Sequence, residues 1–369
     1  MCREKREEER EKRKGLSFKL LFLLFTSYSL LPLAFSQTLT VLTHDSFAIS
    51  GEVVAAFTEE TGIEVEFLPA GDAGEALNRV ILTKGNPLGD VLYGIDNSLL
   101  ARATDEDVFE PYESPVLDQV AERYRFDPAN LVTPIDVGFV NFNYDKGYFA
   151  EAGLEPPSTL QDLTDPAYEG LTVLQNPATS SPGLAFMLAT IDHFGMDGED
   201  DWLSFWADLR DNDVLVTSGW EDAYYTAFTR YDGDRPIVLS YASSPAAEVM
   251  FAEETLDDAP TGNLLCDGCV YQQIEAAGIL KGSANVEAAQ QFIDFMLSDA
   301  FQQDVPPNMF VYPVVEGVAL PPEFEEYGQI PTPEQVAEVP SEEIEANLQS
   351  WLQQWTQVVE QGRDPAEVQ

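Results

Sequence analysis

The sequence predicts an α/β protein in which two lobes enclose a ligand cleft, each lobe built on a mainly parallel sheet flanked by helices. Three observations support this class. Short apolar runs alternate with segments of helical periodicity, as in β-α-β units. The alternation stops near residue 138 and begins again near residue 171, so two such units are present. The 369 residues also suit two domains of about 150 residues each.

The first unit follows directly on the N-terminal segment. Its predicted strands cover residues 38–43, 63–68 and 91–94, and its predicted helices cover 53–57 and 76–81. Gly62 fits the end of the first helix, and Asp72 stands just before the second. Polar residues follow each strand, where a parallel sheet places its ligand sites.

The second unit is entered through an extended crossover strand at residues 136–143. Further strands are predicted at 171–174, 214–216 and 237–241, with helices at 184–191, 202–209, 288–297 and 342–359. We therefore expect lobe 1 to cover 37–137, completed by about 268–369, and lobe 2 to cover 138–267.

The N-terminal 36 residues are expected to form a secretory signal peptide. A charged opening precedes the apolar run from Leu16 to Leu24, and Ala34-Phe35-Ser36 fits the small-residue cleavage pattern. Thr26 and Pro32 interrupt the apolar stretch, which disfavours a permanent membrane anchor. The sequence thus predicts an exported, periplasmic or extracytoplasmic protein.

The chain is strongly acidic. It has 19 Lys and Arg against 65 Asp and Glu, and a net charge of −46. Residues 1–36 carry eight bases and five acids, so the rest of the chain has a net charge near −49. So few bases cannot build a nucleic-acid-binding face or dock on an anionic membrane. The carboxylates are interspersed, which is typical of a halophilic-type acidic surface.

Hydroxyls, carboxylates and aromatic rings follow the predicted strands, with hardly a base among them. These groups are His44-Asp45-Ser46, Asp72, Asp96-Asn97, Thr179-Ser180-Ser181, Ser218-Gly219-Trp220 and Tyr241-Ala242-Ser243-Ser244. Aromatic faces attract cations, and carboxylates neutralise them. The pattern therefore favours a cationic or neutral polar ligand with a flat ring.

Six stretches in order resemble the periplasmic thiamine-binding proteins of ABC transporters, within the two-lobe extracellular solute-binding superfamily. They are Thr43-His44-Asp45-Ser46-Phe47, Gly94 to Leu100, Gln175 to Leu184, Gly219 to Tyr224, Leu239 to Pro245, and Val311-Tyr312-Pro313-Val314. Together they span nearly the whole chain after the signal segment. The resemblance implies a periplasmic-binding-protein-like fold and capture of thiamine or its phosphates.

The resemblance also implies a set of ligand contacts. They fall on Asp72, Ala73, Ser180, Ser181, Trp220, Tyr241, Ala242, Ser243 and Ser244, with a second group of His44, Asp45, Asp96 and Phe310. Trp220 and Tyr241 would cover the ring, and Asp72 would accept from the pyrimidine amine or compensate the cation. The serines would donate to a hydroxyl or phosphate near a helix N-terminus.

Several of these residues have a structural explanation as well. Asp72 and Ser180 suit helix capping, and Asp45 and Asp96 suit hydrogen bonds that hold strand-end loops. His44 is expected to be a polar loop residue rather than a metal ligand, and no metal or cofactor is expected.

The sequence contains the motif Cys266-Asp267-Gly268-Cys269. In an exported chain, a C-x-x-C motif whose central residues favour a turn predicts a local disulfide. A redox site would need this pair at a helix start after a strand, whereas here it is expected in a loop.

The leading functional hypothesis is a receptor without catalytic activity that delivers its ligand to an ABC permease and its ATPase, working as a monomer. Three alternatives stay open. A ferric-ion receptor would use Tyr224 and Tyr225, and a polyamine receptor would use the same acids and aromatic rings. A thiamine-degrading enzyme would need a cysteine nucleophile in the cleft.

Overall fold

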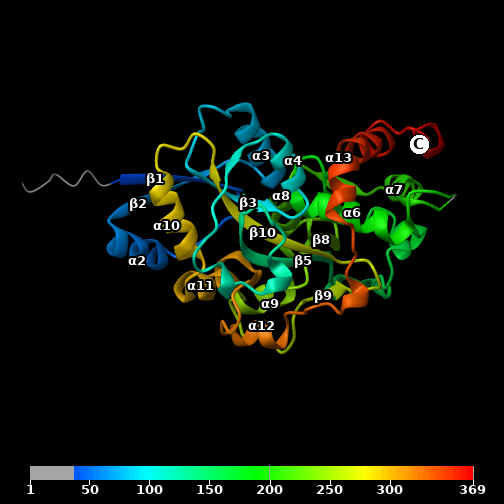
Figure 1. Cartoon of the computed structure of the whole chain (residues 1–369). Helices are drawn as coiled ribbons and strands as arrows, with labels where there is room; N and C mark the ends of the chain where they lie inside the picture. The colour runs from blue at the N-terminus through cyan, green and yellow to red at the C-terminus, as the bar shows by residue number, and fades with distance from the viewer. Residues whose placement is uncertain (1–36, 199, 369) are drawn as a thin grey trace, which may run out of the picture. The chain divides into compact units, whose positions relative to one another are not determined.

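One mixed sheet of eleven strands organises the part of the chain described in the computed structural model, residues 37–198 and 200–368. The main path has the order β2-β1-β3-β10-β5-β8-β6-β7 (Figure 1). Its strands are β1 Gln37–Thr43, β2 Ile63–Pro69, β3 Val91–Asp96, β5 Thr133–Asp145, β6 Thr172–Gln175, β7 Leu215–Thr217, β8 Ile237–Tyr241 and β10 Tyr271–Leu280. The predicted signal segment, residues 1–36, lies outside the described residues.

Parallel pairing occurs toward the two ends of the sheet and antiparallel pairing at its centre. β1 runs parallel to β3, and β6 runs parallel to both β7 and β8. β10 is antiparallel to β3 and β5, and β5 is antiparallel to β8. Short strands β4 (Phe109–Glu110), β9 (Thr261–Leu264) and β11 (Tyr312–Pro313) pair with β10 or β5. The predicted α/β class is confirmed, and the sheet is mixed.

Strand β5 joins the two halves of the sheet. Its first part pairs with β10 as far as Val140, and from Val140 onward it pairs with β8. The partner exchange lies close to the expected lobe boundary at 137/138, although the boundaries themselves stay a prediction.

Helices cover the sheet around both halves (Figure 1). Those near β1 and β2 are α2 Gly51–Thr61, α10 Val286–Met296 and α11 Asp299–Met309, and α3 Ala73–Leu82 and α4 Leu100–Asp105 follow β2 and β3. The others are α5 Lys146–Ala152, α6 Ser181–Phe194, α7 Trp202–Asp211, α8 Trp220–Asp222, α9 Ser244–Met250, α12 Pro322–Glu326 and α13 Ser341–Trp355. No helix in residues 37–198 and 200–368 has the length and apolar character that crossing a membrane requires.

The C-terminal helix α13 packs against α7 through two tryptophans. The fully buried rings of Trp206 and Trp355 meet edge to face, 5.5 Å apart, and Trp206 Nε1 donates to Thr190 Oγ1 at 2.9 Å. This contact stabilises the core, because a buried indole N–H needs a partner. It also attaches the C-terminal segment, expected to complete lobe 1, to a helix of the expected lobe 2.

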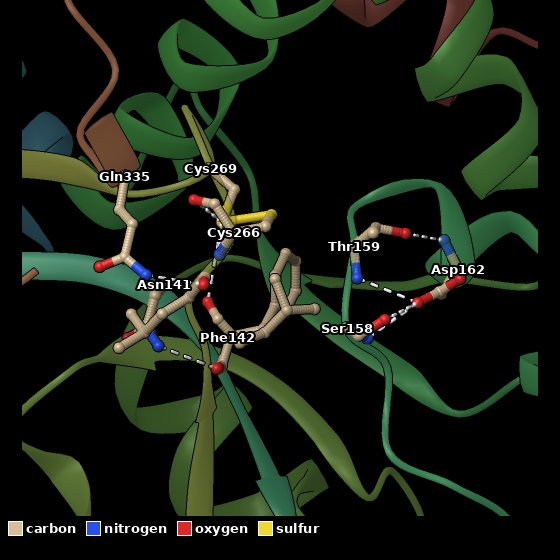
Figure 2. Close-up of a disulfide and its surroundings, with 10 residues drawn as sticks. Asn141, Phe142, Ser158, Thr159, Asp162, Cys266, Cys269 and Gln335 are labelled. Carbon is tan, nitrogen blue, oxygen red and sulfur yellow. Dashed lines mark hydrogen bonds between the residues drawn. A yellow bond between two sulfur atoms is a disulfide. The ribbon is translucent and has the colours of Figure 1, made fainter. Parts of the chain in front are cut away.

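Cys266 and Cys269 are joined by a disulfide in the turn that precedes β10 (Figure 2). Gly268 takes a φ of +67° in this turn, and its N–H donates to Glu334 O at 2.9 Å. Gln335 Nε2 donates to Leu265 O at 2.9 Å. The disulfide therefore closes a short turn that is held against the 334–335 segment.

Candidate ligand-binding site

A pocket of about 560 Å³ lies where strands from both halves of the sheet end. Five of the residues expected from the resemblance line it, namely Asp72, Ser181, Trp220, Tyr241 and Ser244. His44, Asp45 and Phe310 of the second group line it too. The side chains come from the ends of β1 and β8 and from the starts of α3, α6, α8 and α9, the arrangement expected for a ligand site in an α/β sheet.

The other expected residues lie behind the pocket wall. Ala73 and Ala242 are buried, and Ser180 is almost completely inaccessible. Ser243 Oγ donates to the carbonyl oxygen of Phe310, and Asp96 Oδ1 accepts from both the N–H and the hydroxyl of Ser98. These contacts agree with the structural explanation for Asp96.

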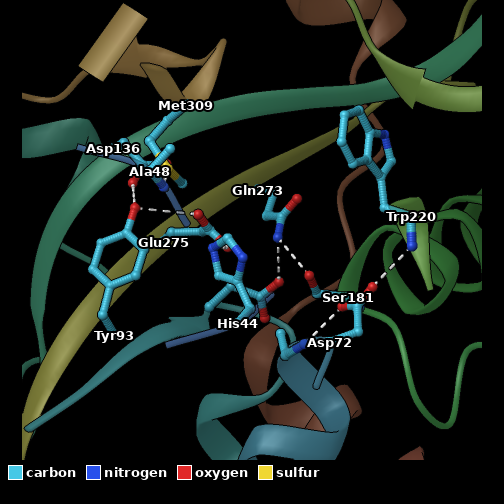
Figure 3. Close-up of polar contacts among 12 residues, drawn as sticks. His44, Ala48, Asp72, Tyr93, Asp136, Ser181, Trp220, Gln273, Glu275 and Met309 are labelled. Carbon is cyan, nitrogen blue, oxygen red and sulfur yellow. Dashed lines mark hydrogen bonds and ion pairs between the residues drawn. The ribbon is translucent and has the colours of Figure 1, made fainter. Parts of the chain in front are cut away.

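Asp72 joins three chain segments through one carboxylate (Figure 3). Its Oδ1 accepts from Ala73 N at 2.6 Å and from Ser181 N at 3.4 Å, and its Oδ2 accepts from Trp220 N at 3.0 Å. Asp72 is thus the N-cap residue of α3 and also a bridge to the starts of α6 and α8. Burial raises the pKa of Asp72, while the hydrogen bond from Trp220 and the nearby His44 oppose that rise.

At this bridge the backbone of two glycines lies very close to neighbouring atoms. A Cβ built on Gly219 would lie 3.0 Å from Asp72 Oδ2, and one built on Gly74 would lie 2.7 Å from Thr179 O. Glu75 N donates to the same Thr179 carbonyl at 3.2 Å. Glycine is therefore required where α3 meets the segments before α6 and α8.

Trp220 forms an aromatic wall with two tyrosines. Its ring stacks on Tyr224 with centroids 4.9 Å apart and planes at 19°, and Tyr225 lies edge-on at 5.3 Å. Trp220 Nε1 donates to Ser240 Oγ at 2.9 Å, which fixes the indole orientation. A single π-helical turn, Ala223–Ala227, follows α8, and such turns are frequent at functional sites.

Glu248, on α9, accepts hydrogen bonds from Tyr224 of this wall and from the neighbouring Tyr231. Its Oε1 accepts from Tyr224 Oη at 2.8 Å and from Tyr231 Oη at 3.2 Å. Arg230 approaches the same carboxylate, with its Nε 3.8 Å from Oε2. Burial and the charge of Glu248 raise the pKa of Tyr224 well above its usual value, so Tyr224 keeps its proton.

His44 and Glu275 form an ion pair on the opposite side of the pocket, with Nε2 and Oε1 3.6 Å apart (Figure 3). Tyr93 donates to Asp136 and, at 3.4 Å, to Glu275 Oε2. Burial by itself lowers the pKa of His44, but Glu275, Asp72 and Asp136 outweigh it and raise the pKa to about 9. His44 is therefore a cation at neutral pH. Burial, with Glu275, raises the pKa of Asp136 well above its usual value.

Gln273 connects the two sides of the pocket. Its Nε2 donates to Ser181 Oγ at 2.9 Å (Figure 3) and to Asp96 Oδ2 at 3.0 Å. Its Oε1 accepts from Tyr241 Oη at 2.9 Å. These hydrogen bonds link β3, β8, β10 and α6. The hydroxyls of Ser181 and Tyr241 are thus engaged inside the protein.

Sequence reasoning missed several residues of the site. Glu275 and Gln273 belong to β10, a strand that the sequence analysis did not predict, because polar residues interrupt its apolar pattern. Glu248 and Tyr231 were not singled out either. Trp220 and the pair Tyr224-Tyr225 are the sequence signals that pointed to this wall.

The lining combines rings with negative charge. Of the described residues that line the pocket, none is Lys or Arg, and five are carboxylates: Asp45, Asp72, Glu221, Glu248 and Glu275. His44 balances one of them. Such a pocket suits an organic cation with a flat ring, since ring faces and carboxylates both attract positive charge.

Two α/β halves joined by long strands, with a pocket at the strand ends, define the two-lobe solute-binding class of proteins. The family model for bacterial extracellular solute-binding proteins matches residues 52–332, and the chain belongs to this family. Its members act outside the cytoplasm, in agreement with the predicted export.

Relatives of this chain include thiamine-binding periplasmic proteins. That of Escherichia coli is 33% identical over 332 residues, covering 89% of this chain and 95% of the relative. That of Salmonella typhimurium is 32% identical over 325 residues, covering 87% of this chain and 93% of the relative. The solved structure of a periplasmic thiamin binding protein matches with a TM-score of 0.75 at 30% identity, covering 87% of this chain and 96% of that one.

A ferric binding protein from Campylobacter jejuni shares the fold, with a TM-score of 0.69 at 18% identity, covering 88% of this chain and 98% of that one. At that identity the likeness concerns the fold alone.

Proposed function

We propose that this protein is a receptor that captures thiamine outside the cytoplasmic membrane and delivers it to an ABC permease and its ATPase. The observation that carries the proposal is the acid-lined pocket with a Trp220–Tyr224 wall, in a chain one-third identical to thiamine-binding proteins over most of its length. The positive thiazolium ring suits the aromatic faces and carboxylates, and the aminopyrimidine offers N–H donors to acidic acceptors.

Ligand capture would proceed by closure of the two lobes, proposed as 37–137 with 268–369 and as 138–267. The pocket takes residues from both, for example His44 from the first and Trp220 from the second. A ligand that contacts both lobes favours the closed state by its differential affinity. We expect a monomer, because one chain supplies the whole pocket.

The ferric alternative has less support from this geometry. Iron ligation needs phenolates, yet the protonated hydroxyl of Tyr224 donates a hydrogen bond to Glu248, and burial raises the pKa of both Tyr224 and Tyr225. Within the described part of the chain, no cluster of three or more His, Cys, Asp or Glu is placed to hold a metal ion. A polyamine would meet the same carboxylates and rings, and the ligand panel below distinguishes it from thiamine.

Binding rather than catalysis is the proposed role. A thiamine-degrading enzyme attacks its substrate with a cysteine, and Cys266 and Cys269 are bonded to each other. Neither is among the residues that line the pocket.

Thermal unfolding with candidate ligands tests the proposal. A ligand that binds the native state raises the melting temperature by mass action. We expect thiamine to stabilise the protein while ferric citrate and spermidine leave it unchanged. Stabilisation by ferric citrate or spermidine without an effect of thiamine would overturn the assignment.

Replacing Trp220 tests the pocket itself. Trp220→Ala removes the stacked ring and should weaken thiamine binding by about 1–3 kcal/mol, measured by isothermal titration calorimetry. Trp220→Phe keeps a ring at the site and should retain most of the affinity. Equal affinity of Trp220→Ala and the unchanged protein would place the ligand elsewhere.

A further inference from the structure

The imidazole of His44 places a positive charge in a pocket that is otherwise lined with acids. Among the described residues that line the pocket, His44 alone carries such a charge, and its Nε2 lies 3.6 Å from Glu275 Oε1 (Figure 3). Gly94 packs against the other side of the ring, since a Cβ built on Gly94 would lie 2.5 Å from His44 Cδ2. The imidazole is therefore held in place at the pocket wall.

Acidic and phenolic groups face this imidazole from the surrounding elements. Burial, with Glu275, raises the pKa of Asp136 well above its usual value, which favours the neutral form of Asp136 and leaves Glu275 as the nearest charged partner of His44. The facing groups are Glu275 of β10, Asp136 of β5, Tyr93 of β3, Asp72 before α3, Glu221 of α8 and the adjacent Asp45.

The proton of the imidazole is held by charge rather than by a hydrogen bond. His44 Nε2 is buried and has no hydrogen-bond partner among the described residues. Its distance of 3.6 Å from Glu275 is too long for a hydrogen bond. A proton that is held in this way depends on the balance of charge around it.

An organic cation in the pocket changes that balance. Burial lowers the pKa of His44, but Glu275 and the neighbouring acids raise it to about 9 in the empty protein. A second positive charge beside the same carboxylates repels the imidazolium and lowers this pKa again. The repulsion grows stronger when water leaves the pocket, because the effective dielectric constant falls.

We infer that His44 holds the place of the ligand's positive charge in the empty pocket, and that binding of an organic cation releases the imidazole proton to water. The inference rests on the proposed function, because it requires the cation to bind in this pocket. One cation enters and one proton leaves, so the net charge of the site is kept and no covalent bond of the ligand changes. The affinity for the cation then rises with pH up to about 9, above which the empty protein has already lost the proton.

Isothermal titration calorimetry of thiamine at pH 8, in buffers with different enthalpies of ionisation, counts the released protons. If the pKa falls by one unit or more from about 9, we expect about 0.4 proton or more per thiamine bound, and an affinity that rises at least about threefold from pH 6 to pH 8.5. Thiamine binding without proton release would overturn the inference and leave the proposed function standing. Absence of thiamine binding would overturn the proposed function, and the inference with it.

The variant His44→Gln assigns the proton to this residue. It should bind thiamine without releasing a proton, and its affinity should vary little between pH 6 and pH 8.5. Release that persists in His44→Gln would assign the proton to Asp136 or Asp72 and contradict the inference. His193→Gln is the matched control, because His193 is exposed and does not line the pocket, and it should release as many protons as the unchanged protein.

A neutral analogue of thiamine tests the role of the ligand's charge in the unchanged protein, and so does not depend on the folding of His44→Gln. Carbon in place of the thiazolium nitrogen keeps the shape of the ligand and removes its charge. Binding of this analogue should release hardly any proton. Equal release with thiamine and with the analogue would mean that closure of the pocket, and not the ligand's charge, removes the proton, and would contradict the inference.

Discussion

The ion pair of His44 and Glu275 makes the stability of the empty protein depend on pH. Their closest atoms are 3.6 Å apart, and the pKa of His44 is about 9 in the folded protein against an ordinary value of 6.5. A group with a raised pKa in the folded state contributes stability that is fully present below pH 6.5 and is lost as the pH rises through 9. At about 1.4 kcal/mol per pH unit, the contribution is roughly 3 kcal/mol.

The variant His44→Gln isolates this contribution because glutamine carries no charge at any pH. We expect His44→Gln to be less stable than the unchanged protein at pH 6. This difference in the free energy of unfolding should be smaller at pH 10, by roughly 3 kcal/mol. Chemical denaturation at a series of pH values measures the difference. Taking the difference between two proteins also cancels the titration of distant groups.

The exposed histidine provides the control. His193→Gln is the control for the loss of a histidine outside the pocket, because His193 is exposed and does not line it. If the difference for His44→Gln does not change with pH, then Glu275, Asp72 and Asp136 do not stabilise the protonated form of His44. The charge assignment on this side of the pocket would then be refuted.

Two further substitutions test the local structure. Gly94→Ala should lower the free energy of unfolding by about 2–4 kcal/mol in chemical denaturation, because Gly94 has a φ of +100° and its Cβ would lie 2.5 Å from His44 Cδ2. Gly85→Ala is the control, since Gly85 has a φ of +89° but open space around it. This variant should lose only the part of the stability that is due to backbone strain. Replacing Cys266 and Cys269 together by serine should lower the stability by no more than about 2 kcal/mol, because the closed loop is so short, and a much larger loss of melting temperature would contradict this.

The sequence predicted those strands and helices whose regular apolar pattern matches their burial in the folded protein. The expected strands at 38–43, 63–68 and 91–94 correspond to β1, β2 and β3, and the helix at 184–191 lies inside α6. Each of these segments has a regular apolar pattern, because one face or both faces are buried in a continuous core. Polar residues after the strands lie at the pocket, since strand ends converge there.

Strand β10 shows why the rest was not predictable. Gln273 and Glu275 are buried in the middle of this strand, where a sequence pattern expects apolar residues. They are tolerated there because Asp96 of β3, Tyr241 of β8 and His44, just after β1, supply their partners. Those partners are 32 to 231 positions away in the sequence, so only the folded structure reveals them.

Asp72 shows that capping a helix and shaping a binding site need not be alternatives. The sequence offered both interpretations. In the structure the same carboxylate caps α3 through Ala73 and also accepts from the backbone N–H groups of Ser181 and Trp220. A cap that faces solvent would serve α3 alone. Because this cap lies where two other segments begin, it also joins α3 to the starts of α6 and α8 and adds a carboxylate to the pocket lining. Its chemical identity therefore matters more to the pocket than its contribution to the stability of α3, which a neutral asparagine would largely preserve.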